Sequence, residues 1–193
     1  MGLSATSPIP VILRHLLSVG TVGVLSGAVS ALGEEIGWRG YLVPALFKIT
    51  DFTRTALMSG LIWAVWHFPG IIFADYSSGA PTWYALICFT VFIVGDSFVL
   101  TWLRMRSSSL WPAVLLHASQ NAFVQSFFTP LTADAGATEY LVTEFGAVMA
   151  VVYGVAGYLF WRQRGRVDLS EEARDAIEAS PASTGGMKTE PVA

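Results

Sequence analysis

Residues 83–103 read WYALICFTVFIVGDSFVLTWL, an almost unbroken apolar run with a single charged residue, Asp96. The run is about as long as the ~20 residues that a helix needs to cross ~30 Å of hydrocarbon. Further apolar runs of this kind lie at 11–32, 52–68, 110–128 and 140–161. None of them has the alternating polarity of a membrane β-barrel strand. The sequence therefore predicts an all-α, polytopic bundle of about five transmembrane spans.

The ends of these runs carry signals of their own. The first run can continue as a helix through Glu34 and Arg39 toward Phe47. We expect the second span to stop at Pro69-Gly70 and the fourth to stop at Pro130, because proline removes a helical hydrogen bond.

The composition agrees with a membrane protein. Of the 193 residues, 53% are hydrophobic and 13% are charged, whereas soluble domains carry about 25% charged residues. The net charge of -3 and the lack of a basic stripe argue against nucleic acid as a partner. The single cysteine, Cys88, cannot form an internal disulfide.

Charges in the loops predict the orientation. Simple alternation of the spans places three basic groups on one side of the membrane: Lys48 with Arg54, Arg104 with Arg106, and Arg162 with Arg164 and Arg166. The opposite loops contain Asp75, Asp134 and Glu139 without Lys or Arg, and Arg14 is the one dissenting charge. The positive-inside rule then predicts an outside N-terminus, a cytoplasmic C-terminus and, for a prokaryotic chain, the plasma membrane. We expect residues 1–166 to form the membrane domain and residues 167–193 to form a polar, disordered cytoplasmic tail.

The stretch Gly33-Glu34-Glu35-Ile36-Gly37-Trp38-Arg39 places charged residues within the first helix. Such groups are costly in a membrane and tend to mark function. Glu35 and Arg39 are four residues apart and can pair on one face, whereas Glu34 points about 100° away and is free to face a cavity. A buried carboxylate of this kind suits a general base. A charge cluster that merely ends the span is the alternative.

The second polar group is Trp63 with His67, again four residues apart, so that the indole can pack against the imidazole. Histidine can act as a base, an acid or a metal ligand. A histidine at the far end of a span can equally be satisfied by backbone or water.

The third group, His117 with Asn121, projects from one face of the fourth span. Together these side chains can bind a carbonyl oxygen or an ion, although interhelical hydrogen bonding alone would also explain them. We expect Gln120 and Gln125 to lie on other faces and to be structural. Asp96 remains an unassigned buried acid that supports the site or pairs with a polar group on the fourth span.

The depths of these groups predict that they meet. Counted at ~1.5 Å per residue from the basic side, Glu34 lies ~21 Å deep and His67 ~24 Å deep. His117 and Asn121 lie ~14 and ~20 Å deep by the same count. Three separate helices thus bring polar groups to overlapping depths, which predicts one shared intramembrane cavity.

The ordered set Glu-Glu-x-x-x-Arg, aromatic-x-x-x-His and His-x-x-x-Asn, each on its own span, resembles the CPBP family. This is the group of CAAX-processing and bacteriocin-processing intramembrane endopeptidases, also called the Abi family. The resemblance covers about residues 33–128, and the fifth span would be a closing helix. The matching residues are Glu34, Glu35, Arg39, Trp63, His67, His117 and Asn121.

The resemblance implies hydrolysis of a peptide bond in a membrane-associated peptide or protein. It implies that Glu34 and His67 activate a water and that His117 and Asn121 donate to the oxyanion. The residues that would orient the site are Glu35, Arg39 and Trp63. The substrates that it suggests are CAAX-type proteins, or bacteriocins and secreted peptides that are matured or neutralised in self-immunity.

Two features depart from the family pattern. Trp63 stands where phenylalanine is usual, which keeps an aromatic packing role but can reshape the cavity. The chain also begins close to the first motif, whereas family members commonly have further spans upstream. We therefore expect either a minimal member or a truncated reading frame.

The residues alone do not decide whether a cofactor is present, and they allow two other functions. Glu34, His67 and His117 are candidate ligands for Zn²⁺, but His-Glu-x-x-His is absent and a metal-free, glutamate-activated water fits equally. One alternative function is a non-catalytic membrane protein that binds substrate like a chaperone. The other is a small ion or proton carrier that uses Glu34, His67 and Asp96 as a relay.

Overall fold

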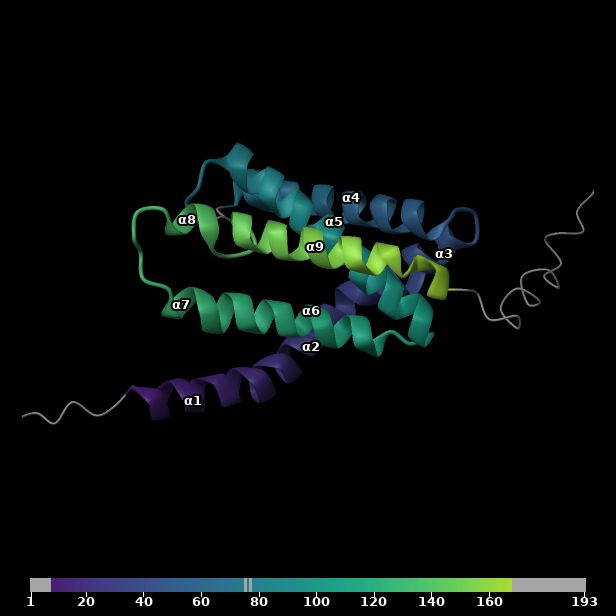
Figure 1. Ribbon diagram of the computed structural model, residues 1–193. Coiled ribbons are helices and arrows are strands. Elements are labelled where there is room, and N and C mark those ends of the chain that lie inside the picture. Colours follow the sequence, from purple (N-terminus) through teal and green to yellow (C-terminus); the bar gives the residue numbers. More distant parts are fainter. Residues whose placement is uncertain (1–7, 75, 77, 168–193) are drawn as a thin grey trace, which may run out of the picture.

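The computed structural model describes residues 8–74, 76 and 78–167. Throughout these residues the regular structure is helical, without a strand, and the helices lie side by side as a bundle (Figure 1). The predicted all-α class is therefore confirmed. The predicted tail, apart from Val167, lies outside the described residues.

The first span is a single continuous helix over Ile9–Phe47, 39 residues long. This confirms that the first apolar run continues through the charged motif. Two π-helical segments interrupt its α-helical geometry, and the second begins directly after Glu35. In order, its parts are α1 (Ile9–Ser18), η1 (Val19–Gly23), α2 (Val24–Glu35), η2 (Ile36–Leu42) and α3 (Val43–Phe47).

The second and third spans are α4 (Phe52–Phe73) and α5 (Thr82–Ser107). The Asp51 side chain caps α4 by accepting a hydrogen bond from the backbone N–H of Arg54. The predicted stop at Pro69-Gly70 is wrong, because α4 continues through Pro69 to Phe73. Proline is tolerated inside membrane helices, where neighbouring groups and small local adjustments satisfy the freed backbone.

The fourth predicted span is a helix over Trp111–Leu131 in three parts, α6 (Trp111–Phe123), π-helical η3 (Val124–Phe128) and α7 (Thr129–Leu131). It ends one residue past Pro130, as predicted. The fifth is not one helix: α8 (Thr138–Leu141) is separated from α9 (Ala147–Arg162) by a turn, and a 3₁₀ turn, η4 (Arg164–Arg166), follows. The single helix predicted from residue 140 is therefore wrong for its first residues. Thr143 takes the left-handed conformation there, with φ of 65°, which an α-helix cannot contain.

Helix α5 is the centre of the bundle and packs between α4 and α9, while α2 packs along α6. Contacts of α5 with α6 and η2 join these two groups. The close approach of α5 to α9 depends on glycine, because a Cβ on Gly95 would lie 2.2 Å from the carbonyl oxygen of Tyr153. The packing brings the polar faces of α2, α4 and α6 toward one another.

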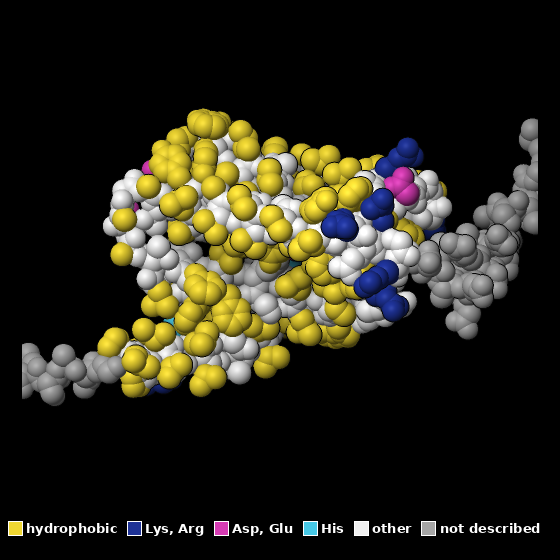
Figure 2. Space-filling model, in the orientation of Figure 1, with side chains coloured by type: hydrophobic (Ala, Val, Ile, Leu, Met, Phe, Trp, Pro, Cys, Tyr) yellow, Lys and Arg dark blue, Asp and Glu magenta, His cyan; other side chains and the backbone are white. Residues whose placement is uncertain are grey.

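The surface is that of an integral membrane protein. The helices Ile9–Phe47, Phe52–Phe73 and Thr82–Ser107 are long and apolar enough to span a bilayer, and α9 is a shorter apolar helix. Hydrophobic side chains cover most of the face in Figure 2, and most of the Lys and Arg side chains visible there gather at the end where α9 finishes. Which compartment this basic end faces stays a prediction.

Candidate active site

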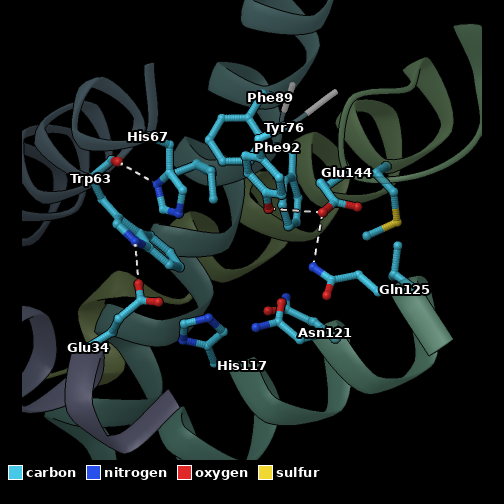
Figure 3. Close-up of a pocket in the computed structure, with 14 residues that line it drawn as sticks. Glu34, Trp63, His67, Tyr76, Phe89, Phe92, His117, Asn121, Gln125 and Glu144 are labelled. Carbon is cyan, nitrogen blue, oxygen red and sulfur yellow. Dashed lines mark hydrogen bonds between the residues drawn. The ribbon is translucent and has the colours of Figure 1, made fainter. Parts of the chain in front are cut away.

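A cavity of about 90 Å³ lies between α2, α4, α5, α6 and the turn before α9. A water needs roughly 10–15 Å³ of such space, so the cavity has room for several waters or for part of a peptide. Figure 3 shows one wall formed by Glu34, Trp63 and His67, the opposite wall by Tyr76, Gln125 and Glu144, and His117 and Asn121 between them. The structure thus brings the four residues expected to do chemistry to one cavity.

Glu34 reaches this cavity from the last turn of α2. Its Oε2 accepts a hydrogen bond of 3.1 Å from Nε1 of Trp63 on α4. Because the side chain is only partly buried and lines the cavity, the carboxylate keeps acceptor capacity for a further donor. Glu34 is therefore held in one orientation, and no Lys, Arg or His among the described residues forms a salt bridge with it.

His67 lies one helical turn after Trp63, and its Nδ1 is 3.0 Å from the Trp63 carbonyl oxygen. A carbonyl can only accept, so Nδ1 carries the hydrogen and Nε2 of the neutral ring has a free lone pair. The rings of Trp66 and Phe89 pack at 4.8 and 5.0 Å from the imidazole. These contacts fix a tautomer in which Nε2 can accept a proton or a hydrogen bond.

The predicted ion pair between Glu35 and Arg39 is confirmed. Arg39 Nη1 lies 2.9 Å from Glu35 Oε1, and the two side chains are 1% and 0% exposed. The same Oε1 accepts a hydrogen bond of 3.0 Å from Nδ1 of His117. A carboxylate only accepts, so Nδ1 carries the hydrogen, and Nε2 is the ring nitrogen left for a partner in the cavity that His117 lines.

Trp63 connects these groups. Besides its bond to Glu34, its ring lies under the Arg39 guanidinium, with Cζ 4.2 Å from the ring centroid, which is the geometry of a cation–π interaction. The His117 and His67 rings lie edge-on at 5.3 and 5.9 Å. The indole N–H supplies a donor to Glu34 that phenylalanine, the usual residue of this motif, lacks.

The prediction that Gln120 and Gln125 lie on other faces of the fourth span is wrong. Both side chains line the cavity together with His117 and Asn121. Gln120 is three residues from His117 and Gln125 is four residues from Asn121, so regular helical spacing places them on or next to the same face. The spacing of Gln120 and Gln125 in the sequence therefore already indicated this position.

Gln120 is also the hydrogen-bond partner of Asp96. Its Nε2 donates a hydrogen bond of 3.0 Å to Asp96 Oδ1 inside the bundle. The expectation that Asp96 pairs with a polar group on the fourth span is confirmed. The second oxygen, Oδ2, is buried without a hydrogen-bond partner among the described residues, and Asp96 does not line the cavity.

Glu144 is a cavity residue that the sequence reasoning missed. It lies in the turn between α8 and α9, and its Oε1 accepts hydrogen bonds from the Tyr76 hydroxyl at 2.9 Å and from Gln125 Nε2 at 3.0 Å. Burial and the neighbouring Glu144 raise the pKa of the Tyr76 phenol, so Tyr76 stays a neutral donor. The sequence does single out this residue, since Glu144 is an acid inside an apolar run.

The described side chains that line the cavity do not fit a bound metal ion. Within 8–74, 76 and 78–167, no three His, Cys, Asp or Glu side chains gather closely enough to hold one. Glu34, His67 and His117 line the same cavity without forming such a cluster, whereas zinc sites take at least three protein ligands.

Comparison with known proteins identifies the family of the chain. The family model described as type II CAAX prenyl endopeptidase Rce1-like matches residues 16–123, more than half of the chain. The chain belongs to this Rce1-like family. The predicted membership of the CPBP group is thereby confirmed, and it makes the chain a member of a family of membrane-embedded proteases.

A curated relative matches over a shorter segment. The chain is similar to CAAX prenyl protease 2 of Methanococcus maripaludis, with 30% identity over 94 residues, which are 46% of this chain and 34% of that protein. The chain thus spans about a third of the length of this relative. No solved structure matches it. The segment matched by the Rce1-like model contains Glu34, His67, His117 and Asn121, whereas Gln125 and Glu144 lie outside it.

Proposed function

We propose that this chain carries the catalytic site of an intramembrane endopeptidase that hydrolyses a peptide bond of a membrane-associated peptide or protein. One observation carries the proposal: Glu34, His67, His117 and Asn121 come from three separate helices and line one cavity large enough for water. CAAX-type C-termini are the first substrate class to test, because the family description and the relative's name both refer to them. Processing of bacteriocins or other secreted peptides is the second.

In the proposed first step, a water in the cavity gives a proton to the Glu34 carboxylate while its second hydrogen bonds to His67 Nε2. The water oxygen attacks the carbonyl carbon, and the carbonyl electrons move to the oxygen. Asn121 Nδ2 and the Nε2–H of protonated His117 donate to this oxyanion. Glu35 supports the charge on His117 through their 3.0 Å contact.

In the proposed second step, the oxyanion collapses and the carbon–nitrogen bond breaks. Glu34 returns its proton to the departing nitrogen, which leaves as an amine, and the new acid leaves as the other product. Trp63 holds Glu34 in place in both steps. Proton transfer by a positioned group of this kind typically accelerates a reaction about 10²–10⁴-fold.

The test is cleavage of lipid-anchored CAAX peptides and of apolar peptides by the purified protein in lipid nanodiscs. We expect Glu34→Gln to lower kcat at least about 10²-fold, because the amide still accepts from Trp63 but cannot take a proton. Glu139→Gln is the matched control, since Glu139 lies on α8 and does not line the cavity. Equal cleavage by the wild type and Glu34→Gln would contradict the proposal, and binding without cleavage by either would favour the non-catalytic alternative.

We further propose that the basic end of the bundle is cytoplasmic, in the plasma membrane of a prokaryote. The Lys48 and Arg106 loops and the end of α9 then face the cytoplasm, in line with the positive-inside rule.

A further inference from the structure

The wall of the cavity opposite Glu34 contains a second carboxylate, that of Glu144. Its side chain is 8% exposed, and it comes from the turn that separates α8 from α9. The backbone is specialised at this turn: Thr143 has a φ of 65° and bonds through its hydroxyl to the N–H of Phe145. A Cβ on Gly146 would lie 2.3 Å from the carbonyl oxygen of Val142. An otherwise apolar helix is thus interrupted where Glu144 enters the cavity.

The hydrogen bonds of Glu144 orient its carboxylate without balancing its charge. Tyr76 and Gln125, which come from two other parts of the chain, both donate to Oε1. Both donors are neutral. Glu35, by contrast, has the Arg39 guanidinium at 2.9 Å. No Lys, Arg or His within the described ranges forms a salt bridge with Glu144.

Buried charges in proteins are normally paired, because an uncompensated charge is costly in an apolar surrounding. The rings next to Glu144 suit a cation. Tyr76 packs at 4.8 Å from Phe145 and at 6.4 Å from Phe89, and Phe89 and Phe92 line the cavity. Aromatic faces attract ammonium and guanidinium groups, so a carboxylate beside such rings is a surrounding that favours a positive group.

We propose that Glu144, oriented by Tyr76 and Gln125, is a subsite for a positively charged group of the substrate, the side chain of lysine or arginine or a free amine. The inference rests on the proposed peptidase function and adds a substrate preference to it. The cation of the substrate supplies the countercharge that the described part of the chain does not. Glu34 and His67 on the opposite wall then face the peptide bond to be cleaved.

The first test compares peptides that are identical except for lysine or norleucine at one position, scanned along the chain. Norleucine keeps the methylenes and lacks the ammonium group. At one position we expect the wild type to favour lysine about tenfold or more in kcat/KM, the size of a charge-assisted hydrogen bond. Equal rates at every position would overturn the proposal without any variant.

The second test removes the charge. Glu144→Gln keeps an acceptor for Tyr76, and we expect it to lower the preference for the lysine peptide over the norleucine peptide about tenfold, through a higher KM for the lysine peptide. Glu139→Gln, the control from the neighbouring helix, should keep the preference. A merely structural role of Glu144 would slow both peptides equally, which would overturn the proposal. If Glu144→Gln does not fold, Tyr76→Phe replaces it and should weaken the lysine preference.

Direct binding separates this proposal from the peptidase function. Methylguanidinium chloride is titrated into the intact protein, with sodium chloride as the salt control, and thermal unfolding is recorded. We expect methylguanidinium to raise the Tm of the wild type and of Glu139→Gln but not that of Glu144→Gln. If no peptide is cleaved, the peptidase function fails while this titration still decides the cation subsite. An equal shift in all three proteins would overturn it.

Discussion

The buried ion pair of Glu35 and Arg39 allows a quantitative prediction. The two side chains are 0% and 1% exposed, and only one oxygen and one nitrogen of the pair are used: Glu35 Oε2 and Arg39 Nε and Nη2 are buried without a hydrogen-bond partner among the described residues. Removing Glu35 leaves the Arg39 guanidinium buried without its carboxylate, and removing Arg39 leaves the Glu35 carboxylate with only its contact to His117. Breaking a buried pair in this way costs about 3–5 kcal/mol. Replacing both members by neutral groups of similar size is often close to neutral.

We therefore expect Arg39→Met alone and Glu35→Gln alone each to lower the free energy of unfolding by about 3–5 kcal/mol. Independent effects would sum to about 6–10 kcal/mol in the double variant. We expect the double variant to lose no more than about 2 kcal/mol, mainly the cation–π contact of Arg39 with Trp63. The coupling energy is then at least about 4 kcal/mol.

The assay is reversible unfolding in mixed detergent micelles, followed by circular dichroism. The exposed pair of Arg54 and Asp51, 73% and 57% exposed at 3.4 Å, is the control and should couple by less than about 1 kcal/mol. A double variant of Glu35 and Arg39 that loses the sum of its single variants would refute this account of the pair. Peptidase activity should stay low in the stable double variant, because a neutral amide in place of the Glu35 carboxylate no longer supports a protonated His117.

Three further predictions follow from other parts of the molecule. Gly95→Ala should lower the free energy of unfolding by about 2–3 kcal/mol, because the added Cβ overpacks the contact between α5 and α9. Gly37→Ala, whose Cβ meets open space, should raise the free energy of unfolding by about 0.5–1 kcal/mol in the same assay. Asn121→Ala should lower kcat about 10²–10³-fold with little change in KM, measured with the peptides above; a change in KM alone would contradict an oxyanion role. In a background without the native cysteine, Ser108→Cys should react with a membrane-impermeant maleimide only after the cells are opened. Ala135→Cys should react in intact cells. The reverse pattern would contradict the proposed orientation of the chain in the membrane.

The helices were predictable from the sequence because their cause is local. A long apolar run such as 83–103 must form a helix to satisfy its backbone in lipid, and α5 covers this run. The end of α4 was not predictable in this way, since tertiary surroundings decide whether a proline such as Pro69 ends a membrane helix. The break before α9 depends on the left-handed Thr143, which composition and hydropathy do not reveal.

The polar residues of the site were predictable as far as helical spacing reaches. Spacing of four residues paired Glu35 with Arg39 correctly, and the same rule applied to Asn121 would have included Gln125. Glu144 stands out in the sequence as an acid inside an apolar run, but its partner Tyr76 and its place in the cavity could not be predicted, because both residues lie in connections whose path depends on packing between distant helices. Their link spans 68 positions of the chain, beyond any local pattern.

In the proposed reaction, Glu34 activates a water in the cavity to cleave a peptide bond. The decisive experiment is single-turnover cleavage in water enriched in ¹⁸O, with the wild type and Glu34→Gln side by side and the products analysed by mass spectrometry. We predict that the wild type places one heavy oxygen in the new carboxyl group and that Glu34→Gln forms product at least about 10²-fold more slowly. Labelled product at equal rates from both proteins would contradict the claim.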